Sequence, residues 1–401
     1  MISPAPARLP WVDHLRTFAI FLVVVTHSCV TYSHVGSWYV MSDRDPSLNE
    51  KLPFILVEGL NQSFFMGLLF FISAYFAEKS LAKRGPTAFA RERLFRLGLP
   101  TLLFMLVIHP FIVVGLHPWP GERPALLPWL RHYLLRGEFL GSTGPLWFAF
   151  ALLIFCLVFA LLSTRSVGAA NVGPTTRPTT AGSPADSPLA HYSILANSNP
   201  PSAASVWFFA ATLGLATWLV RFVQPLGTSV MNMQLGYFSQ YILAFYLGVR
   251  AARGGWLVPL AATPQAARAG IVTIVVAPLA LLAILIAGVR GGPHVFDGGL
   301  HWQAFALAMW EQLTGVGLSL GLLAWFSRHL ARETQPRRWL ADRSFGVYVL
   351  HTPVLIALFL LFRRLPDIPL ALAALMVVCG LVTSYVLADL AKRLPGLRAI
   401  L

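Results

Sequence analysis

The stretch at residues 11–38 reads WVDHLRTFAIFLVVVTHSCVTYSHVGSW. Its centre is an apolar run from Thr17 to Val25, typical of a helix buried in lipid. Asp13 and Arg16 lie on one side of this run and His27 lies on the other. Titratable groups inside a membrane helix are energetically expensive and are functional candidates for that reason. The stretch therefore predicts a membrane helix that carries chemistry, and it is read as an uncleaved span.

The rest of the 401-residue chain is equally apolar. Hydrophobic residues make up 56% and charged residues 11%, whereas soluble domains carry about 25% charged residues. This composition excludes an ordinary soluble enzyme and a disordered protein. A membrane helix needs about 20 mostly apolar residues, and ten segments qualify: 12–31, 53–77, 95–116, 145–163, 205–222, 236–252, 269–289, 302–326, 344–362 and 368–391. We predict an all-α polytopic membrane bundle of about ten transmembrane helices.

The basic residues predict how this bundle is oriented. With a cytoplasmic N-terminus, the inner segments hold 21 of the 30 Lys and Arg residues. Cytoplasmic loops are the basic ones in membrane proteins, so both termini are expected in the cytoplasm. We expect a multi-pass protein of the cell (inner) membrane, with the bilayer as its main partner. The net charge of +14 reflects these loops, and without a nucleic-acid-binding signature we expect no nucleic-acid partner.

One long segment differs from the rest. Residues 164–204 are rich in Ser, Thr, Pro, Ala and Gly and hold few large apolar side chains. Such a segment cannot bury enough surface to offset the entropy of ordering, so it predicts a disordered cytoplasmic linker. It separates residues 1–163, with the first four helices, from residues 205–401, with the last six.

The first helix carries its polar residues on one face. Arg16 and His27 are eleven residues apart, which corresponds to about 3.06 helical turns, a face angle of roughly 20° and an axial distance of about 16.5 Å. Asp13 can pair with Arg16 at i,i+3, and His34 continues the stripe if the helix persists. Alternatively, Arg16 snorkels to the headgroups and His27 is hydrogen-bonded inside the bundle.

Two further groups stand out. Arg93 and Arg96 form an R-x-x-R pair on one helix face before the third span; guanidinium groups bind phosphates, although a plain positive-inside loop has the same composition. Ser344 and His351 share a face of the ninth span, with His351 about 10 Å inside the cytoplasmic surface by helical rise. His351 is alternatively a satisfied core histidine. Glu311 is a candidate for a buried polar pair.

The cysteines predict neither a disulfide framework nor a metal site. Cys29, Cys156 and Cys379 are far apart, and each lies in or beside an apolar segment. Small buried side chains are the expected role for such residues. No metal is expected.

These stretches together resemble membrane-bound acyltransferase family 3. The resemblance rests on DHLR at 13–16 followed by His27, FFISAYF at 70–76, RLFR at 93–96 and SFGVYVLH at 344–351, in that order. It covers one domain of about residues 10–393 apart from the linker. Ala74 replaces a glycine that is frequent in the family. The stretch after the first helix is most similar to the branch that includes glucan-modifying succinyltransferases.

The resemblance implies a membrane O-acyltransferase. Such proteins transfer an acyl group, here acetyl or succinyl, from cytoplasmic acyl-CoA to a hydroxyl of an extracytoplasmic glycan. Acyl-CoA is the donor substrate, and no permanently bound cofactor is expected. By the resemblance, His27 is the general base or a transient acyl carrier. The other roles it implies are these: Arg93 and Arg96 hold CoA phosphates, Arg16 steadies the donor with Asp13 fixing it, and Ser344 and His351 line the inner end of the cavity.

Two other functions compete with this reading. A transporter or flippase of a lipid-linked saccharide also needs many helices and buried polar groups, but it should show matching halves or paired broken helices, and the sequence shows neither. A non-catalytic membrane partner would not need the complete set of Arg16, His27, Arg93 and Arg96. Homo-oligomerisation stays open, as does the choice between direct transfer and a covalent acyl-enzyme.

Overall fold

The computed structural model describes residues 9–119, 121–170 and 200–400. In these ranges the chain is built from helices without a named β-strand, and its one isolated bridge joins Val230 and Met233. The all-α bundle predicted from the sequence is confirmed.

The α-helices form most of the fold. The longer ones are α1 (Pro10–Ser33), α2 (Leu48–Arg84), α6 (Trp147–Ala170), α8 (Ala203–Val220), α9 (Phe238–Gly254), α11 (Pro264–Gly288), α12 (Trp302–His329), α13 (Gln335–Phe362) and α14 (Pro369–Arg393). The shorter ones are α3 (Pro86–Arg93), α4 (Leu99–Leu103), α5 (Leu126–Leu135), α10 (Leu257–Ala262) and α15 (Leu397–Ile400). Short 3₁₀ turns are η4 (Glu138–Gly141), η5 (Gly144–Leu146), η7 (Leu235–Tyr237), η8 (Val289–Gly291) and η9 (Pro293–Phe296).

The third span, Pro86–Leu116, is an irregular helix. It alternates α-helical turns with π-helical turns at η1 (Leu94–Gly98), η2 (Phe104–Ile108) and η3 (Phe111–Leu116). Pro100 and Pro110 follow the first two of these turns. A proline lacks the N–H that the α-helical pattern requires, and π-helical turns accommodate such a break.

Nine helices in the described part of the chain are long and apolar enough to cross a membrane. They match nine of the ten predicted spans. The remaining segment, 236–252, forms α9, which has 17 residues and is short of the usual length of about 20. The cytoplasmic position of both termini stays a prediction.

The linker predicted at 164–204 is too long at both ends. α6 continues to Ala170 and α8 begins at Ala203. The side chain of Ser202 caps α8 by accepting a hydrogen bond from the Ser205 N–H at 3.2 Å. The prediction for residues 171–199 lies outside the described residues.

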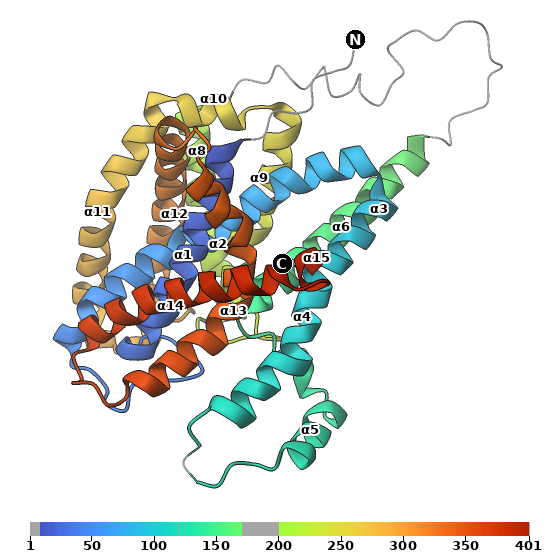
Figure 1. Ribbon diagram of the computed structural model, residues 1–401. Helices are drawn as coiled ribbons and strands as arrows, with labels where there is room; N and C mark the ends of the chain where they lie inside the picture. Colours follow the sequence, from blue (N-terminus) through green and yellow to red (C-terminus); the bar gives the residue numbers. More distant parts are fainter. Residues whose placement is uncertain (1–8, 120, 171–199, 401) are drawn as a thin grey trace, which may run out of the picture.

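α1 lies at the centre of the bundle (Figure 1). It packs against α2, α12, α13 and α14, while α2 runs along α9 and α11 along α12. The helices from α3 to α6 form an arm on one side, and α11 lies on the other side of the bundle. α1 therefore meets helices from both halves of the sequence, which places its polar face inside the molecule.

Candidate functional site

Three nearly parallel rings meet at the C-terminal third of α1. The imidazole of His27 stacks on the indole of Trp38, with centroids 3.6 Å apart and planes at 15°. The imidazole of His351, from α13, lies 5.3 Å from that of His27 with an interplanar angle of 11°. Trp38 and His351 are 6.2 Å apart. We call Trp38, His27 and His351 the His27 cluster.

These three distances fix the arrangement. They describe a triangle with nearly a right angle at His27. Since the indole covers a face of the His27 ring, His351 lies beside that ring, edge to edge in almost the same plane. Trp38 therefore covers His27, and His351 is its lateral neighbour.

The hydrogen bond of His351 fixes its tautomer. Its Nδ1 lies 2.7 Å from the carbonyl oxygen of Tyr348. A carbonyl only accepts, so Nδ1 donates, and the Nε2 of the neutral ring carries a lone pair. This Nε2 is buried without a hydrogen-bond partner. The Tyr348 hydroxyl in turn donates to the Pro145 carbonyl and holds this part of α13 against the start of α6.

Two unsatisfied buried polar atoms belong to the His27 cluster itself, Trp38 Nε1 and His351 Nε2. Seven buried side-chain nitrogen or oxygen atoms in the described chain have no hydrogen-bond partner. The hydroxyls of Ser28 and Thr352, the next residues after the two histidines in the chain, are also buried without a partner. Buried polar groups are nearly always paired, so two orphaned nitrogens in one ring cluster indicate that a polar ligand belongs there.

The segment that carries Trp38 is tied down at several points. α1 ends at Ser33, and His34 caps it in the left-handed region with φ 58°. The helix does not persist to His34, so His34 does not continue the α1 stripe, and its Nε2 instead lies 2.9 Å from the Ser42 carbonyl oxygen. Arg44 binds Asp367 at 2.8 Å, which fastens the segment to the α13–α14 connection. The segment forms a fixed cover over His27.

Charged residues hold the same segment from the α2 side. Arg44 also binds Glu50 at 2.9 Å. Lys51 pairs with Asp45 at 2.6 Å, and its hydrogen bond lowers the pKa of that exposed carboxyl. A proton therefore leaves Asp45 more readily than an ordinary aspartic acid, which keeps this ion pair intact at neutral pH.

Arg16 and Asp13 lie as predicted on α1. Their side chains pair at 3.4 Å, and that of Arg16 is 42% exposed. α1 is unbroken from Pro10 to Ser33, so the calculated angle between Arg16 and His27 applies to the folded helix. His14, beside them, is fixed by its Nδ1 at 2.9 Å from the Leu330 carbonyl oxygen. The predicted pairing is confirmed.

Arg93 and Arg96 have different surroundings. The guanidinium of Arg93 lies over the Phe89 ring at 5.0 Å, and its Nε is buried without a partner. Arg96 is exposed and pairs with Glu92 at 3.4 Å. Within the described chain, no hydrogen bond, ion pair or ring contact joins either arginine to the His27 cluster.

His351 lies elsewhere than the sequence predicts. The expectation placed it with Ser344 at the inner end of the cavity, whereas it contacts the ring of His27. The reason is that α13 begins at Gln335, so His351 lies sixteen residues into the helix, about 24 Å by helical rise. Ser344 is buried and donates its hydroxyl hydrogen to the Ala341 carbonyl at 2.9 Å.

Trp38 is the site residue that sequence reasoning missed. It stands in a short polar segment between the first two helices, eleven residues after His27. An aromatic residue at such a position near the membrane surface is usually assigned to the interfacial belt. Only the turn at His34 brings Trp38 back over the imidazole of His27.

Comparison with known proteins agrees with this geometry. A family model described as an acyltransferase domain, that of acyltransferase family 3, matches residues 9–390. No curated protein and no solved structure matches the chain. The matched range includes α1, the R-x-x-R pair and α13, and therefore the whole His27 cluster. With its long apolar helices the protein is a multi-pass membrane acyltransferase, and the chain belongs to acyltransferase family 3.

Proposed function

We propose that the protein transfers an acetyl or succinyl group from cytoplasmic acyl-CoA to a hydroxyl of an extracytoplasmic glycan, and that the reaction takes place at the His27 cluster. The observation that carries this proposal is the contact of two imidazoles in a ring cluster where His351 Nε2 and Trp38 Nε1 are buried without a partner. Imidazole is the side chain best suited to exchange protons near neutral pH.

His27 is the group that reacts. In direct transfer, the acceptor oxygen bonds to the thioester carbonyl carbon while the C–S bond breaks. The imidazole takes the hydroxyl proton and passes it to the departing CoA thiolate. In transfer by way of the enzyme, the His27 nitrogen first forms the bond to the acyl carbon and the thiolate leaves. The acceptor hydroxyl then displaces the imidazole.

His351 has the role of proton acceptor in the second route. Its Nδ1–H is held by the Tyr348 carbonyl, so its Nε2 is free to accept a proton. It lies beside His27 and is fully buried. We assign this role in place of the cofactor contact suggested by the sequence.

The donor is held by basic residues nearer the cytoplasmic ends of the helices. Arg93 and Arg96 bind CoA phosphates, because guanidinium groups pair with phosphate oxygens through two hydrogen bonds. Arg16, oriented by Asp13, steadies the donor on the α1 face that leads to His27. Trp38 covers His27 on the opposite, extracytoplasmic side, where the glycan arrives. The proposal includes a location in the inner membrane with both termini in the cytoplasm.

Release of free CoA tests the proposal. Purified protein in lipid vesicles receives acetyl-CoA or succinyl-CoA and a periplasmic glycan extract. We expect His27→Ala to lower CoA release at least 100-fold, as is typical for loss of an acid–base group. Arg93→Ala/Arg96→Ala should mainly raise the KM for the donor. His294→Ala, with a side chain 93% exposed, is the matched control and should act like wild type.

The outcomes separate the roles. Full acyl transfer by well-expressed His27→Ala protein would overturn the central role of His27. A covalent route predicts radiolabelled acyl groups on His351→Asn protein, because acylation of His27 proceeds while the acceptor step fails. If folded wild-type protein neither binds nor cleaves any acyl-CoA, a transporter of a lipid-linked saccharide becomes the better assignment.

A further inference from the structure

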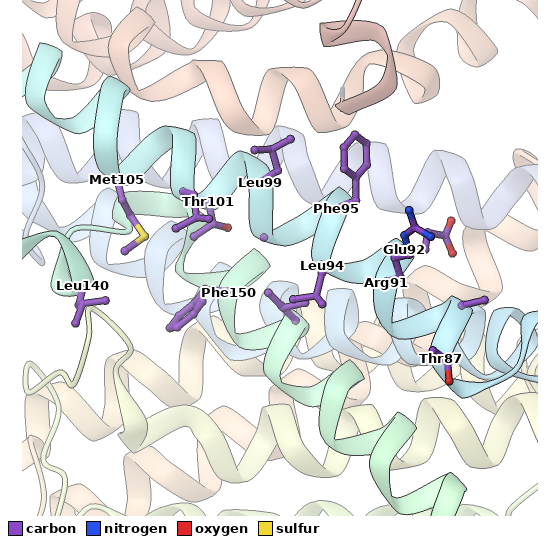
Figure 2. Close-up of a pocket in the computed structure, with 14 residues that line it drawn as sticks. Thr87, Arg91, Glu92, Leu94, Phe95, Leu99, Thr101, Met105, Leu140 and Phe150 are labelled. Atoms are coloured by element: carbon purple, nitrogen blue, oxygen red, sulfur yellow. The ribbon is translucent and has the colours of Figure 1, made fainter.

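A long groove of about 1120 Å³ runs along the third span (Figure 2). It lies between the third span and α6, and most of its lining is apolar. The lining residues are Thr87, Ala88, Arg91, Glu92, Leu94, Phe95, Gly98, Leu99, Thr101, Leu102, Met105, Leu140, Phe150 and Leu153. Figure 2 shows Arg91 and Glu92 at one end of this row and Met105 and Leu140 at the other.

The groove has the dimensions of a lipid chain. From Thr87 to Met105 the helix covers about 27 Å at the usual rise, close to the hydrocarbon thickness of about 30 Å. Leu94, Phe95 and Leu102, which line it, are about half exposed. The groove is therefore open to the bilayer along its length and offers an extended apolar contact.

Its charged end offers a free cation. The side chain of Arg91 is exposed and makes no hydrogen bond or ion pair within the described chain. The neighbouring carboxylate of Glu92 is neutralised by Arg84 and Arg96, each at 3.4 Å. This end of the groove is consequently positive, and Arg91 is available to an anionic headgroup.

This arginine is separate from the R-x-x-R pair. Positions 91 and 93 point to nearly opposite sides of a helix. The helix face that carries Arg93 continues through Leu97 and Phe104, which are both buried. The face that carries Arg91 continues through Leu94 into the groove. The third span thus presents basic residues on two faces, and the groove belongs to the one that faces lipid.

We propose that this groove is a binding site for an anionic phospholipid. The lipid phosphate pairs with Arg91, and one acyl chain lies along Leu94, Phe95 and Leu102 toward Leu140. An anionic head on a long apolar chain is the ligand that complements a cation at the end of an apolar groove. The proposal does not depend on the acyl-transfer chemistry assigned to the His27 cluster.

Lipid binding to the purified protein tests the site. Delipidated protein in detergent is titrated with phosphatidylglycerol and, separately, with phosphatidylcholine of the same chains, and bound lipid is counted by native mass spectrometry. Each basic residue near a surface contributes about a five-fold preference for an anionic lipid. We therefore expect wild type to prefer phosphatidylglycerol, and Arg91→Gln to lose about that factor. Arg91→Lys should keep most of the preference.

Two variants separate the site from general surface charge. Lys83→Gln removes an exposed charge at the end of α2, on the same side of the molecule, and should leave the preference unchanged. Gly98→Leu fills the groove, because a Cβ at Gly98 already lies 3.4 Å from the Leu153 side chain. It should weaken binding of both lipids. A thermal unfolding curve checks whether Gly98→Leu folds. If it does not fold, the comparison of Arg91→Gln with Lys83→Gln still tests the proposal.

Three results would overturn the proposal. The first is equal binding of the two lipids by wild type. The second is an equal loss in Lys83→Gln and Arg91→Gln, which would mean general surface charge. The third is displacement of phosphatidylglycerol by soluble glycerol phosphate or by a long-chain acyl-CoA. Displacement by glycerol phosphate would show that the chain is not bound, and displacement by acyl-CoA would assign the groove to the donor.

Discussion

Arg221 shows how strongly a single residue can depend on the rest of the fold. Its side chain is fully buried and pairs with Glu311 of α12 at 2.5 Å. The polar partner predicted for Glu311 is confirmed. The guanidinium also lies 5.1 Å from the Tyr237 ring and donates from Nε to the Gly236 carbonyl at 3.3 Å. The pair therefore joins α8, α12 and the turn before α9.

Breaking this pair should cost much stability. We expect Glu311→Gln to lower the free energy of unfolding by about 3–5 kcal/mol, because it leaves the Arg221 charge buried and uncompensated. The double variant Arg221→Met/Glu311→Leu should recover most of that loss, since it removes both charges. Thermal unfolding in detergent, followed by circular dichroism, measures both. A single variant as stable as wild type would show that water already screens Arg221.

At the same scale, the sequence predicts the candidate site residues but not the contacts between them. Helical periodicity relates Arg16 to His27 because both belong to one helix. The contact of His27 with His351 joins residues more than three hundred positions apart, and it depends on how α1 packs against α13. Trp38 depends on a turn whose left-handed residue, His34, is not a glycine. Neither packing nor such a turn has a local sequence signal.

At the scale of elements, the sequence predicts the helices because their apolar length is set by the bilayer. It does not predict their ends. α6 and α13 extend beyond the apolar segments that reveal them, because helix formation does not stop where hydrophobicity does. The π-helical turns of the third span also remain hidden, since prolines alone do not specify how a helix adjusts.

The contact between α11 and α12 gives a prediction for this scale. A Cβ at Gly270 would collide with the Cα of Gly321, so the two backbones touch, as small residues permit in membrane helices. We expect Gly270→Leu to lower the free energy of unfolding by about 1–3 kcal/mol, the usual cost of overpacking. Thermal unfolding in detergent measures the change.

A matched control exists for this variant. Gly141 has open space where a Cβ would be placed, so Gly141→Leu should leave the unfolding temperature unchanged. Equal losses in both variants would mean that the close approach of the backbones at Gly270 is not the cause. Gly270→Ala should fall between wild type and Gly270→Leu, because a methyl group separates the backbones less.

At the scale of the whole molecule, α9 decides the topology. It has 17 residues, yet it packs along α2 through the bundle. A Cβ at Gly248 would collide with the Phe71 carbonyl oxygen, which shows how closely the two helices approach. A buried helix is shielded from lipid by its neighbours and can cross a bilayer with fewer apolar residues. With α9 as a span the chain crosses ten times, and both termini lie on one side.

Labelling of single cysteines tests this crossing. Four exposed residues serve as label positions. Before α9, Lys83 is predicted to lie inside and Glu122 outside. After α9, His294 is predicted to lie outside and Arg332 inside. In cells that make each cysteine variant, a membrane-impermeant maleimide should react with Glu122→Cys and His294→Cys but not with Lys83→Cys or Arg332→Cys. Cys29 and Cys156 are buried, and a Cys379→Ala background removes the remaining native thiol.

If α9 does not cross the membrane, the reactivities of the cysteines at positions 294 and 332 are reversed, while those at positions 83 and 122 stay the same. That result would place the C-terminus outside. α1 and α13 would then be inserted in opposite directions. The contacts of His14 with Leu330 before α13 and of Arg44 with Asp367 after it require that the two helices run in the same direction.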